Sequence, residues 1–219
     1  KSFQLETFSK LIENKEALAR GTVDGTVILN QSNSATTFTS DLRLKELSFK
    51  NIPTGDIHLL ASNTSNPKKF DVKMDLSGND NQINADGYYS TETKVPSLNL
   101  SLNIERLNLK TIEPYTFGQV TQMSGSLKGK ATISGGSDAP DITGSFQFLS
   151  CGFRPKFLDS YLRVEDETIT LESKKVYFNS FTLVDSLDNK ATLDGYANIQ
   201  DFKTIPFDLH LKTNNFLAL

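Results

Sequence analysis

Hydrophobic and polar residues alternate along several stretches of the chain. The clearest examples are residues 70–76 and 98–104, where every second side chain is apolar. Residues 207–211 follow the same pattern, and residues 142–148 follow it in part. A period of two residues puts successive side chains on opposite sides of an extended backbone. The alternation therefore predicts β-strands with one apolar face and one face suited to water.

Clusters of turn-forming residues separate these stretches at short intervals. They are rich in Gly, Asn, Asp and Ser, and they occupy residues 77–81, 86–87, 134–138, 188–189 and 194–195. Short connections of this kind are typical of hairpins between antiparallel neighbours. Thr, Val, Ile, Phe and Tyr, which favour extended structure, fill the segments between them. We therefore predict an all-β fold built from antiparallel hairpins.

Two short segments have a helical pattern instead. Ser9 could cap the first helix and Gly21 could end it, with five apolar residues near one side of it: Phe8, Leu11, Ile12, Leu18 and Ala19. The second segment is residues 111–118, where a short helical turn would begin near Pro114. Each helix would precede a series of strands as a short cap.

Three sequence patterns occur twice, in the same order. Residues 20–25 resemble 124–129, residues 84–88 resemble 192–196, and residues 98–102 resemble 207–211. Such repetition indicates that like units are added along one axis. We predict a helical cap or the end of a preceding repeat over 1–20, a first repeat over 21–118 and a second over 119–219.

A sheet with one apolar face must bury that face. The strands could close on themselves around a dry core, or they could curl into an open trough; alternation alone does not separate the two. Open-ended repetition favours an elongated, curled sheet with a groove. The apolar residues of the alternating strands are expected to line this groove, and ordinary core packing is the alternative role for each of them. They are Phe70, Val72, Met74, Leu76, Leu98, Leu100, Leu102, Ile104, Phe146, Phe148, Phe207, Leu209 and Leu211. Five glycines are expected at bends or bulges that curl the sheet: Gly87, Gly125, Gly129, Gly144 and Gly195.

Charge and cysteine content narrow the choice of partners. The 219 residues carry a net charge of −3, which argues against nucleic acid as the main partner, since phosphate binding needs a basic surface. The single cysteine, Cys151, lies in an apolar context and predicts a buried side chain.

The chain starts at Lys1 without Met and ends on a strand-like run at 216–219, so we expect a fragment of a longer protein.

Catalytic and metal-binding patterns are weak. The two histidines, His58 and His210, alternate with apolar residues and are expected on the wet side of strands. No Ser–His–acid arrangement or phosphate-binding loop can be placed. The acidic and amide residues at 80–86 lack the spacing of an EF-hand loop. We expect no enzyme, no cofactor and no metal site.

Between residues 98 and 148, a Gly-x-Leu-x-Gly strand (Gly125, Leu127, Gly129) is followed by a Gly-containing turn, an Ala139–Pro140 pair and a second strand near Gly144. This pattern resembles the TamB family, the translocation and assembly module proteins of bacterial envelopes, which are related to AsmA-like proteins. Residues 21–29 repeat the first part without the Ala–Pro pair. Abundant Asn, Lys and Thr suit a Bacteroidetes-type source.

This resemblance implies a fold and a role. It implies a β-taco-like groove in the periplasmic portion of an inner-membrane-anchored protein. The implied partners are lipid acyl chains and an outer-membrane barrel protein of the TamA type, with membrane contact made by parts outside this chain. The implied function is phospholipid transport between the membranes, assistance to outer-membrane protein assembly and secretion, or both. The rival interpretation is a structural or adhesive β-module that binds proteins by strand addition at its sheet edges.

Overall fold

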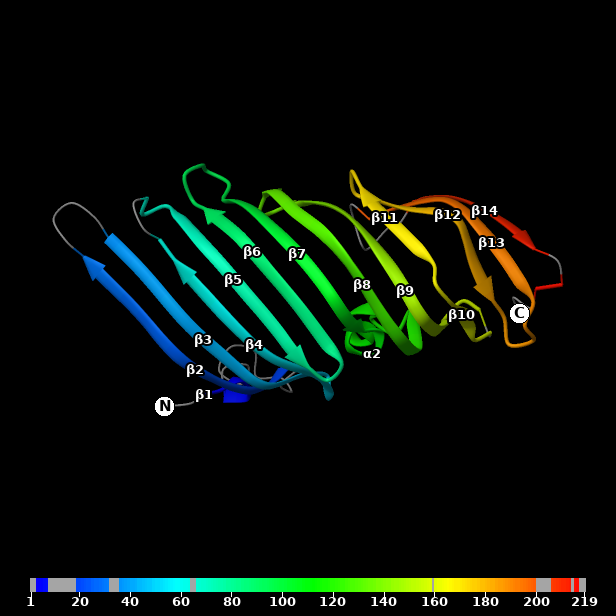
Figure 1. Ribbon diagram of the computed structural model, residues 1–219, viewed down its shortest axis with the longest axis horizontal. Helices are drawn as coiled ribbons and strands as arrows, with labels where there is room; N and C mark the ends of the chain where they lie inside the picture. Colours follow the sequence, from blue (N-terminus) through cyan, green and yellow to red (C-terminus); the bar gives the residue numbers. More distant parts are fainter. Residues whose placement is uncertain are drawn as a thin grey trace. The chain divides into compact units, whose positions relative to one another are not determined.

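The protein is an all-β chain whose strands form one antiparallel sheet. The structure is a computed structural model that describes residues 3–7, 19–31, 36–63, 66–158, 160–199, 206–213 and 215–216. Within these ranges, fourteen strands follow each other across the sheet almost in chain order (Figure 1). Only β11 leaves this order, pairing with both β9 and β12. The predicted fold class is confirmed at this level.

The strands differ in length, and the first seven lie before the helical segment. They are β1 (Phe3–Gln4), β2 (Ala19–Gln31), β3 (Thr36–Phe49), β4 (Ile52–Ser62), β5 (Lys69–Gly78), β6 (Asn81–Ser90) and β7 (Ser97–Asn108). Those after it are β8 (Val120–Gly136), β9 (Asp141–Pro155), β10 (Leu162–Val164), β11 (Thr168–Glu172), β12 (Lys175–Val184), β13 (Lys190–Asn198) and β14 (Phe207–Thr213).

The chain divides into two compact units. The first unit comprises Lys1–Asn103 and Ile133–Pro140, and the second comprises Ile104–Thr132 and Asp141–Leu219. The repeats predicted at 21–118 and 119–219 divide the chain by its sequence repetition, whereas the two units divide it by compactness. The repeats therefore stay a prediction.

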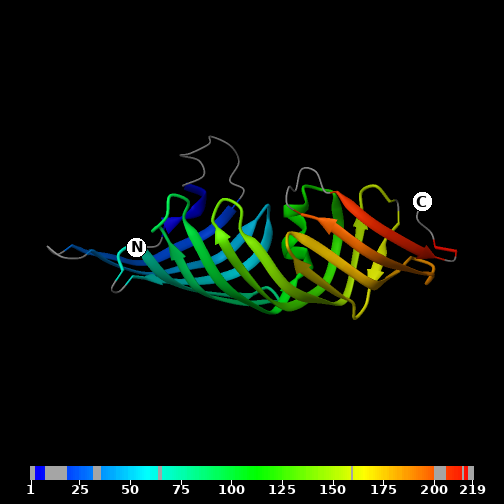
Figure 2. The ribbon, with the colours of Figure 1, turned by 90° about the horizontal axis from the view of Figure 1, so that it is seen from above.

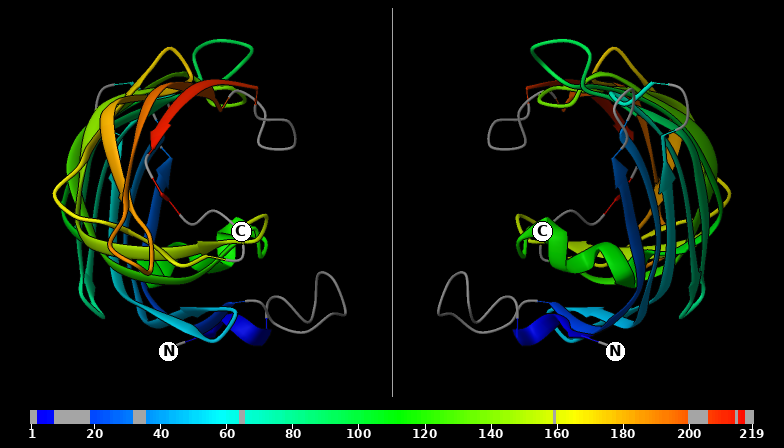
Figure 3. Two further views of the ribbon diagram at one scale, coloured as in Figure 1. Left: turned by 90° about the vertical axis from the view of Figure 1, so that its right-hand side faces the viewer. Right: turned by 90° about the vertical axis from the view of Figure 1, so that its left-hand side faces the viewer.

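Helix α2 (Leu109–Ile112) and the 3₁₀ turn η1 (Glu113–Thr116) belong to the second unit. Helical structure begins before the predicted start at Pro114, because the Asn108 side chain caps it by accepting a hydrogen bond from the Lys110 backbone N–H at 3.0 Å. Both elements lie against one face of the strands of this unit, on their concave side (Figures 2 and 3).

The predicted N-terminal helix is described only at its edges. Residues 5–7 are helical, whereas Ala19 and Gly21 belong to strand β2, so the prediction of Gly21 as a helix end is wrong. Backbone pairing of β2 with β3 extends back to Ala19, which explains the difference. The other residues of that prediction, Ser9 and the four apolar residues from Phe8 to Leu18, lie outside the described residues.

Turn chemistry explains several hairpins. Asn79 and Asp80 have φ values of 51° and 62°, as the tight connection between β5 and β6 requires. In contrast, the predicted turns at 86–87 and 194–195 are wrong, because both pairs lie inside strands, β6 and β13. The glycines of these two pairs, Gly87 and Gly195, have a role inside the sheet instead of in a turn.

Gly87 and Gly195 lie where the backbone of the next strand comes very close. A Cβ at Gly87 would lie 2.0 Å from the Asn99 carbonyl oxygen, and one at Gly195 would lie 2.0 Å from that of Asp208. Their φ values are 151° and 122°, in a region that side chains disfavour. These two glycines therefore permit a close approach of neighbouring strands that alanine would prevent.

This leads to a prediction about Gly195→Ala, with Gly118→Ala as its control. Gly118 also has a positive φ, 78°, but nothing lies within 4 Å of the position that a Cβ would occupy there. We expect Gly118→Ala to cost about 1 kcal/mol of backbone strain, and Gly195→Ala to cost about 1–3 kcal/mol more through the clash. Urea unfolding of both variants measures the difference. Equal losses would show that strands β13 and β14 do not approach as closely as described.

Candidate apolar face

The first unit carries a continuous apolar surface across strands β2 to β6. Residues paired directly across neighbouring antiparallel strands point to the same side of a sheet. The pairing places the following three rows and two pairs on one side: Val23, Leu44, Ile57, Leu76 and Ile83; Gly25, Leu42, Leu59, Met74 and Ala85; Val27, Ser40, Ala61, Val72 and Gly87; Leu29 with Phe38; and Phe70 with Tyr89. We call this set the apolar face.

Most of the apolar face remains partly accessible to solvent. Leu76, at 8% exposed, is the only large hydrophobic residue of the first unit that is buried among the described residues. Val27 and Leu29 are 58% and 66% exposed at the β2 end of the face. A contact between the rings of Phe38 and Phe70, 5.7 Å apart, joins β3 to β5 at one margin. Within the described residues, no second layer of this unit therefore buries the apolar face.

The opposite side of the same strands is charged and hydrated. Along β5, the exposed residues Lys69, Asp71, Lys73 and Asp75 alternate with apolar ones. On β3 and β4, His58 Nε2 lies 2.9 Å from Asp41 Oδ1. Polar contacts between partly exposed side chains of this kind contribute little to stability. The first unit is thus an amphipathic sheet.

The predicted groove residues of β5 and β7 lie as follows. Phe70, Val72 and Met74 are half-buried on the apolar face, beside the buried Leu76. On β7, three leucines are half-buried: Leu98, Leu100 and Leu102. Ile104, in the second unit, is buried at 6% exposed.

Strands β3 and β4 contribute residues that the sequence reasoning missed. Leu42, Leu44, Ile57 and Leu59 all lie on the apolar face. The signal was present in the sequence, because Leu42 and Leu44 flank Arg43 and Ile57 and Leu59 flank His58. These short runs have the same period of two as the longer ones.

In the second unit, side chains of α2 and several strands bury the corresponding surface. The buried residues Leu109, Cys151, Val164 and Phe181 form a core cluster. Partly buried side chains, including Ile112 from α2, pack around it. The second unit therefore has a closed hydrophobic core where the first unit has an accessible face.

The predicted groove residues of β9 contribute to packing in this unit. Phe146 is 8% exposed, and Phe148 packs against the core cluster. The rings of Phe148 and Phe178 both meet the Phe181 ring edge-on, with centroids 5.6 and 5.4 Å apart. Such pairs add about 0.5–1.5 kcal/mol beyond area burial. Phe148 thus has a demonstrated packing role.

The three predicted residues of β14 share one side of that strand. They lie opposite Ala197, Gly195 and Leu193 of β13, in the order Phe207, Leu209, Leu211. Phe207 is 69% exposed and Leu211 is 50% exposed, whereas Leu209 is half-buried. This strand therefore presents apolar side chains with little cover.

Cys151 is buried as predicted, at 2% exposed. Its thiol donates hydrogen bonds to the carbonyl oxygens of Ser126 at 3.2 Å and Leu149 at 3.5 Å. Burial raises the pKa of the Cys151 thiol, which disfavours the reactive thiolate. This environment is that of a structural cysteine.

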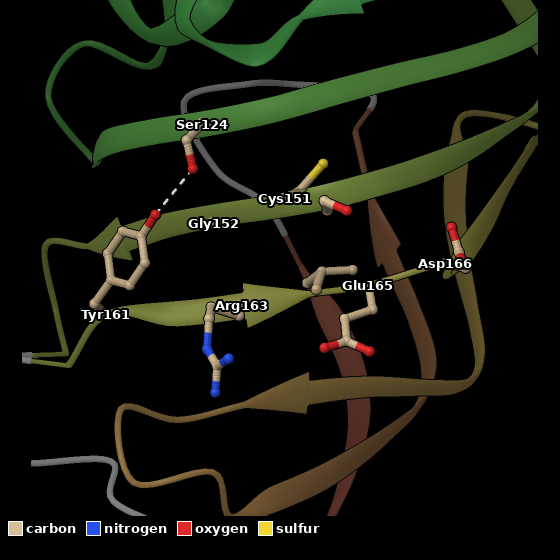
Figure 4. Close-up of a pocket in the computed structure, with 9 residues that line it drawn as sticks. Ser124, Cys151, Gly152, Tyr161, Arg163, Glu165 and Asp166 are labelled. Atoms are coloured by element: carbon tan, nitrogen blue, oxygen red, sulfur yellow. Dashed lines mark hydrogen bonds between the residues drawn. The ribbon is translucent and has the colours of Figure 1, made fainter.

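A pocket of about 330 Å³ lies in the second unit beside β9 and β10 (Figure 4). The Tyr161 ring covers Gly152, and its hydroxyl lies 2.9 Å from Ser124 Oγ. Arg163, at the pocket wall, forms an ion pair with Asp188. Glu165 and Asp166 also line the pocket, so its charges are mixed. Within the lining Tyr161 and Ser124 contact each other, whereas Arg163 pairs with Asp188 outside it.

The two histidines and the acidic residues form no metal site in the described ranges. His58 pairs with Asp41, and His210, whose side chain is 75% exposed, lies 3.9 Å from Asp208. Within those ranges, no group of three or more His, Cys, Asp or Glu side chains is placed to hold a metal ion. None of the helices among the described residues has the length and hydrophobicity needed to cross a membrane.

Comparisons with known proteins leave the family open. No family model matches the chain, and no match is found among curated proteins or solved structures.

The contrast between the two units generates a stability prediction. We expect Phe181→Ala to cost about 3–5 kcal/mol, as for a large side chain deleted from a closed core. We expect Phe70→Ala to cost only about 1 kcal/mol, because a half-buried side chain loses part of the roughly 1.5–3 kcal/mol of full burial. Urea denaturation of both variants gives the comparison. Similar losses would mean that the apolar face is covered as fully as the core.

A second prediction concerns thiol reactivity. Ellman's reagent should react with Cys151 slowly in native protein and rapidly in denaturant, because the thiol is buried and its pKa is raised. A Ser124→Cys variant provides an exposed thiol on neighbouring β8 as a control. Fast labelling of native Cys151, at the rate of the control, would contradict the burial described here.

Proposed function

We propose that this chain is a periplasmic segment of a TamB-like envelope protein whose apolar surface accommodates phospholipid acyl chains. The observation that carries the proposal is the apolar face of the first unit, which stays accessible beside a charged opposite side. Covering each methylene group of an acyl chain is worth about 0.8 kcal/mol, so contact with a face that is only half-buried in the folded chain would stabilise a bound lipid tail. Contiguous apolar patches that stay accessible on a folded domain often mark a binding site.

Geometry at matched glycines supports the proposal that the sheet consists of two tandem six-strand blocks. Gly21 and Gly25 on β2 correspond to Gly125 and Gly129 on β8, each pair 104 residues apart. A Cβ at Gly25 would lie 2.0 Å from the Asp41 oxygen, and one at Gly129 would lie 2.2 Å from the Ser145 oxygen, again 104 residues further on.

The same correspondence extends to a backbone irregularity and to the last strands of each block. Glu46 and Ser150 are 104 residues apart, and both have positive φ values, 54° and 49°. They lie against Gly21 and Gly125, respectively. Gly87 and Gly195 approach β7 and β14 in the same way. The proposed first block is β2–β7, and the second is β8–β14, with β10 and β11 together in the place of β4.

The proposed role follows from combining the blocks with the family resemblance. The amphipathic sheet of the first unit would provide the apolar surface, while its charged side would remain in the aqueous periplasm. The whole protein would be anchored in the inner membrane by another segment and would act with a TamA-type barrel protein. Phospholipid transfer between membranes is the function that the apolar face favours, and assistance to outer-membrane protein assembly and secretion is the related role.

Two adjacent leucines allow a direct test. Leu59 lies on the apolar face between Leu42 and Met74, whereas Leu60 lies on the charged side between Asp41 and Lys73. We expect Leu59→Arg to reduce the lipid that copurifies with the chain, or that it takes up from liposomes, by at least about tenfold. This estimate corresponds to the loss of about 1.4 kcal/mol of binding. Leu60→Arg should bind like the unchanged protein, as measured by native mass spectrometry.

Circular dichroism and urea unfolding establish whether each variant is folded. Met74→Gln provides a milder change on the same face if Leu59→Arg is unstable. Absence of lipid from the unchanged protein, before and after liposome exposure, would refute the proposal. Equal lipid binding by the Leu59 and Leu60 variants would also refute it, since the charged side would then serve as well as the apolar face.

Strand addition at a sheet edge is the second candidate function. The observation that favours it is β14, which pairs with β13 and exposes Phe207 and Leu211. A module that acts only in this way would bind a protein strand through backbone hydrogen bonds, and its apolar face would need no lipid.

A further inference from the structure

Two loops of the second unit carry the most exposed large hydrophobic side chains among the described residues. Phe117 is 82% exposed, Phe157 is 79% exposed, and Tyr115, two residues before Phe117, is 54% exposed. The first loop, residues 115–119, covers the end of η1 and leads into β8. The second loop, residues 156–158, follows β9. We call these two segments the aromatic loops.

The aromatic loops are neighbours in space. The Lys156 backbone N–H donates a hydrogen bond to the Gln119 carbonyl oxygen at 2.8 Å, which joins the two loops directly. Both loops lie at the α2 end of strands β8 and β9 (Figure 1). The exposed rings therefore belong to one region of the surface. Grouped apolar side chains of this kind often mark an interaction site, whereas single ones scattered over a surface do not.

Hydrogen bonds hold the first aromatic loop in shape. The Gln119 backbone N–H donates to the Thr116 carbonyl oxygen at 3.0 Å, and Thr116 Oγ1 lies 2.8 Å from the Val120 carbonyl oxygen. Just before the loop, a Glu113 carboxylate oxygen accepts a hydrogen bond from the Met123 backbone N–H at 2.8 Å. A loop that is already ordered in the free protein loses little conformational entropy on binding, so it suits a contact site.

Phe117 has a backbone conformation that favours glycine or asparagine. Its φ of 52° and ψ of 31° lie in the left-handed region, at the end of η1. A bulky residue in this conformation is strained, and its largely exposed ring gains only part of its possible burial within the folded chain. Strained residues of this kind cluster at functional sites, which supports a binding role for the loop.

The charges around the aromatic loops are mainly positive. Lys110 and Lys156 are exposed and Arg154, near the end of β9, is half-buried. Glu113 is the one acidic residue among the described residues of α2, η1 and the aromatic loops, and Asp159 lies outside the described residues. This balance is opposite in sign to the net charge of −3 of the whole chain. Exposed rings flanked by basic side chains complement a bilayer with anionic headgroups.

We propose that the aromatic loops dock the second unit onto the surface of an anionic phospholipid bilayer. Phe117 and Phe157 enter the interfacial region with Tyr115, while Lys110 and Lys156 face the phosphate groups. A bilayer accepts rings that project from two loops, whereas a protein partner would need a matching pocket for each ring. This contact is made by the chain itself, in addition to any made by parts outside it. It does not rest on the function proposed for the apolar face.

Cosedimentation with vesicles tests the proposal on the unchanged chain. The chain should bind equimolar phosphatidylcholine–phosphatidylglycerol vesicles at least about tenfold more tightly than phosphatidylcholine vesicles, because the basic side chains meet anionic headgroups. Combined Phe117→Asn and Phe157→Ser substitutions should weaken this binding at least about tenfold, and asparagine relieves the strain at 117. The matched control is Leu187→Ser, because Leu187 is 68% exposed in the connection between β12 and β13 of the same unit. This control should bind like the unchanged chain.

Single tryptophans report whether the aromatic loops enter the bilayer. The chain contains no Trp, so Phe117→Trp and Phe157→Trp each introduce one fluorophore while they keep an aromatic ring. Vesicles that contain phosphatidylglycerol should shift the emission of either variant to shorter wavelength, and brominated phospholipid in the vesicles should quench it. Leu187→Trp should show neither change.

Circular dichroism and urea unfolding establish that each variant is folded. Absence of binding between the unchanged chain and the anionic vesicles would overturn the proposal. Equal binding of neutral and anionic vesicles, undiminished binding by the double phenylalanine variant, or equal quenching at 187 would also overturn it, since another surface or another force would then hold the bilayer. Self-association in place of vesicle binding, abolished in the double variant, would assign the loops to a protein contact and overturn the bilayer as their occupant.

Failure of this proposal is distinguishable from failure of the lipid proposal. Leu59→Arg should lose copurifying lipid and still bind anionic vesicles, because Leu59 lies on the apolar face of the first unit. The double phenylalanine variant should keep copurifying lipid and lose vesicle binding. Vesicle binding without copurifying lipid in the unchanged chain would reject only the function proposed for the apolar face.

Discussion

An amphipathic antiparallel sheet is stable in water only to the extent that its apolar side is removed from solvent, and this constraint organises the whole protein. The second unit satisfies this constraint with its own side chains. Leu109 and Ile112, presented by a short helix, pack with Phe181 and Val164 into a closed cluster. In the first unit, cross-strand pairing builds an apolar surface of similar character, yet only Leu76 among its large side chains is buried in the described residues. The same strand chemistry therefore produces a core in one unit and an accessible surface in the other.

This difference gives the apolar face its functional interest. Side chains that gain only part of their hydrophobic burial in the folded chain can gain the remainder from a ligand. The opposite side of the same strands carries polar groups, such as His58 and Asp41, which remain hydrated. Acyl chains match this arrangement because they need contact without hydrogen bonds. The polar pocket around Tyr161 and Arg163 offers the opposite chemistry, because its lining carries hydroxyl, guanidinium and carboxylate groups.

Strand identity could be predicted well, and burial could not. The alternation over residues 70–76 determines which side chains share a face, because a period of two follows directly from strand geometry. Periodicity does not reveal what covers that face. The burial of Phe148 depends on Phe181, which is remote in sequence and lies on another strand. The Asp86–Gly87 pair predicts a turn, because Asp–Gly pairs usually occur in turns. Gly87 lies inside strand β6 instead, where the absence of a Cβ lets the Asn99 carbonyl oxygen come close. Helix α2 begins earlier than Pro114 suggests because Asn108 provides a cap.

We propose that acyl chains lie on the apolar face of the first unit. The most direct measurement is photo-cross-linking of the purified chain with a diazirine-bearing phospholipid, followed by mass-spectrometric mapping of the modified residues. We predict that cross-links concentrate on β3, β4 and β5 at residues such as Leu42, Leu59 and Met74, and that excess unlabelled phospholipid suppresses them. Cross-links distributed equally over the charged side, or insensitive to unlabelled lipid, would contradict this claim.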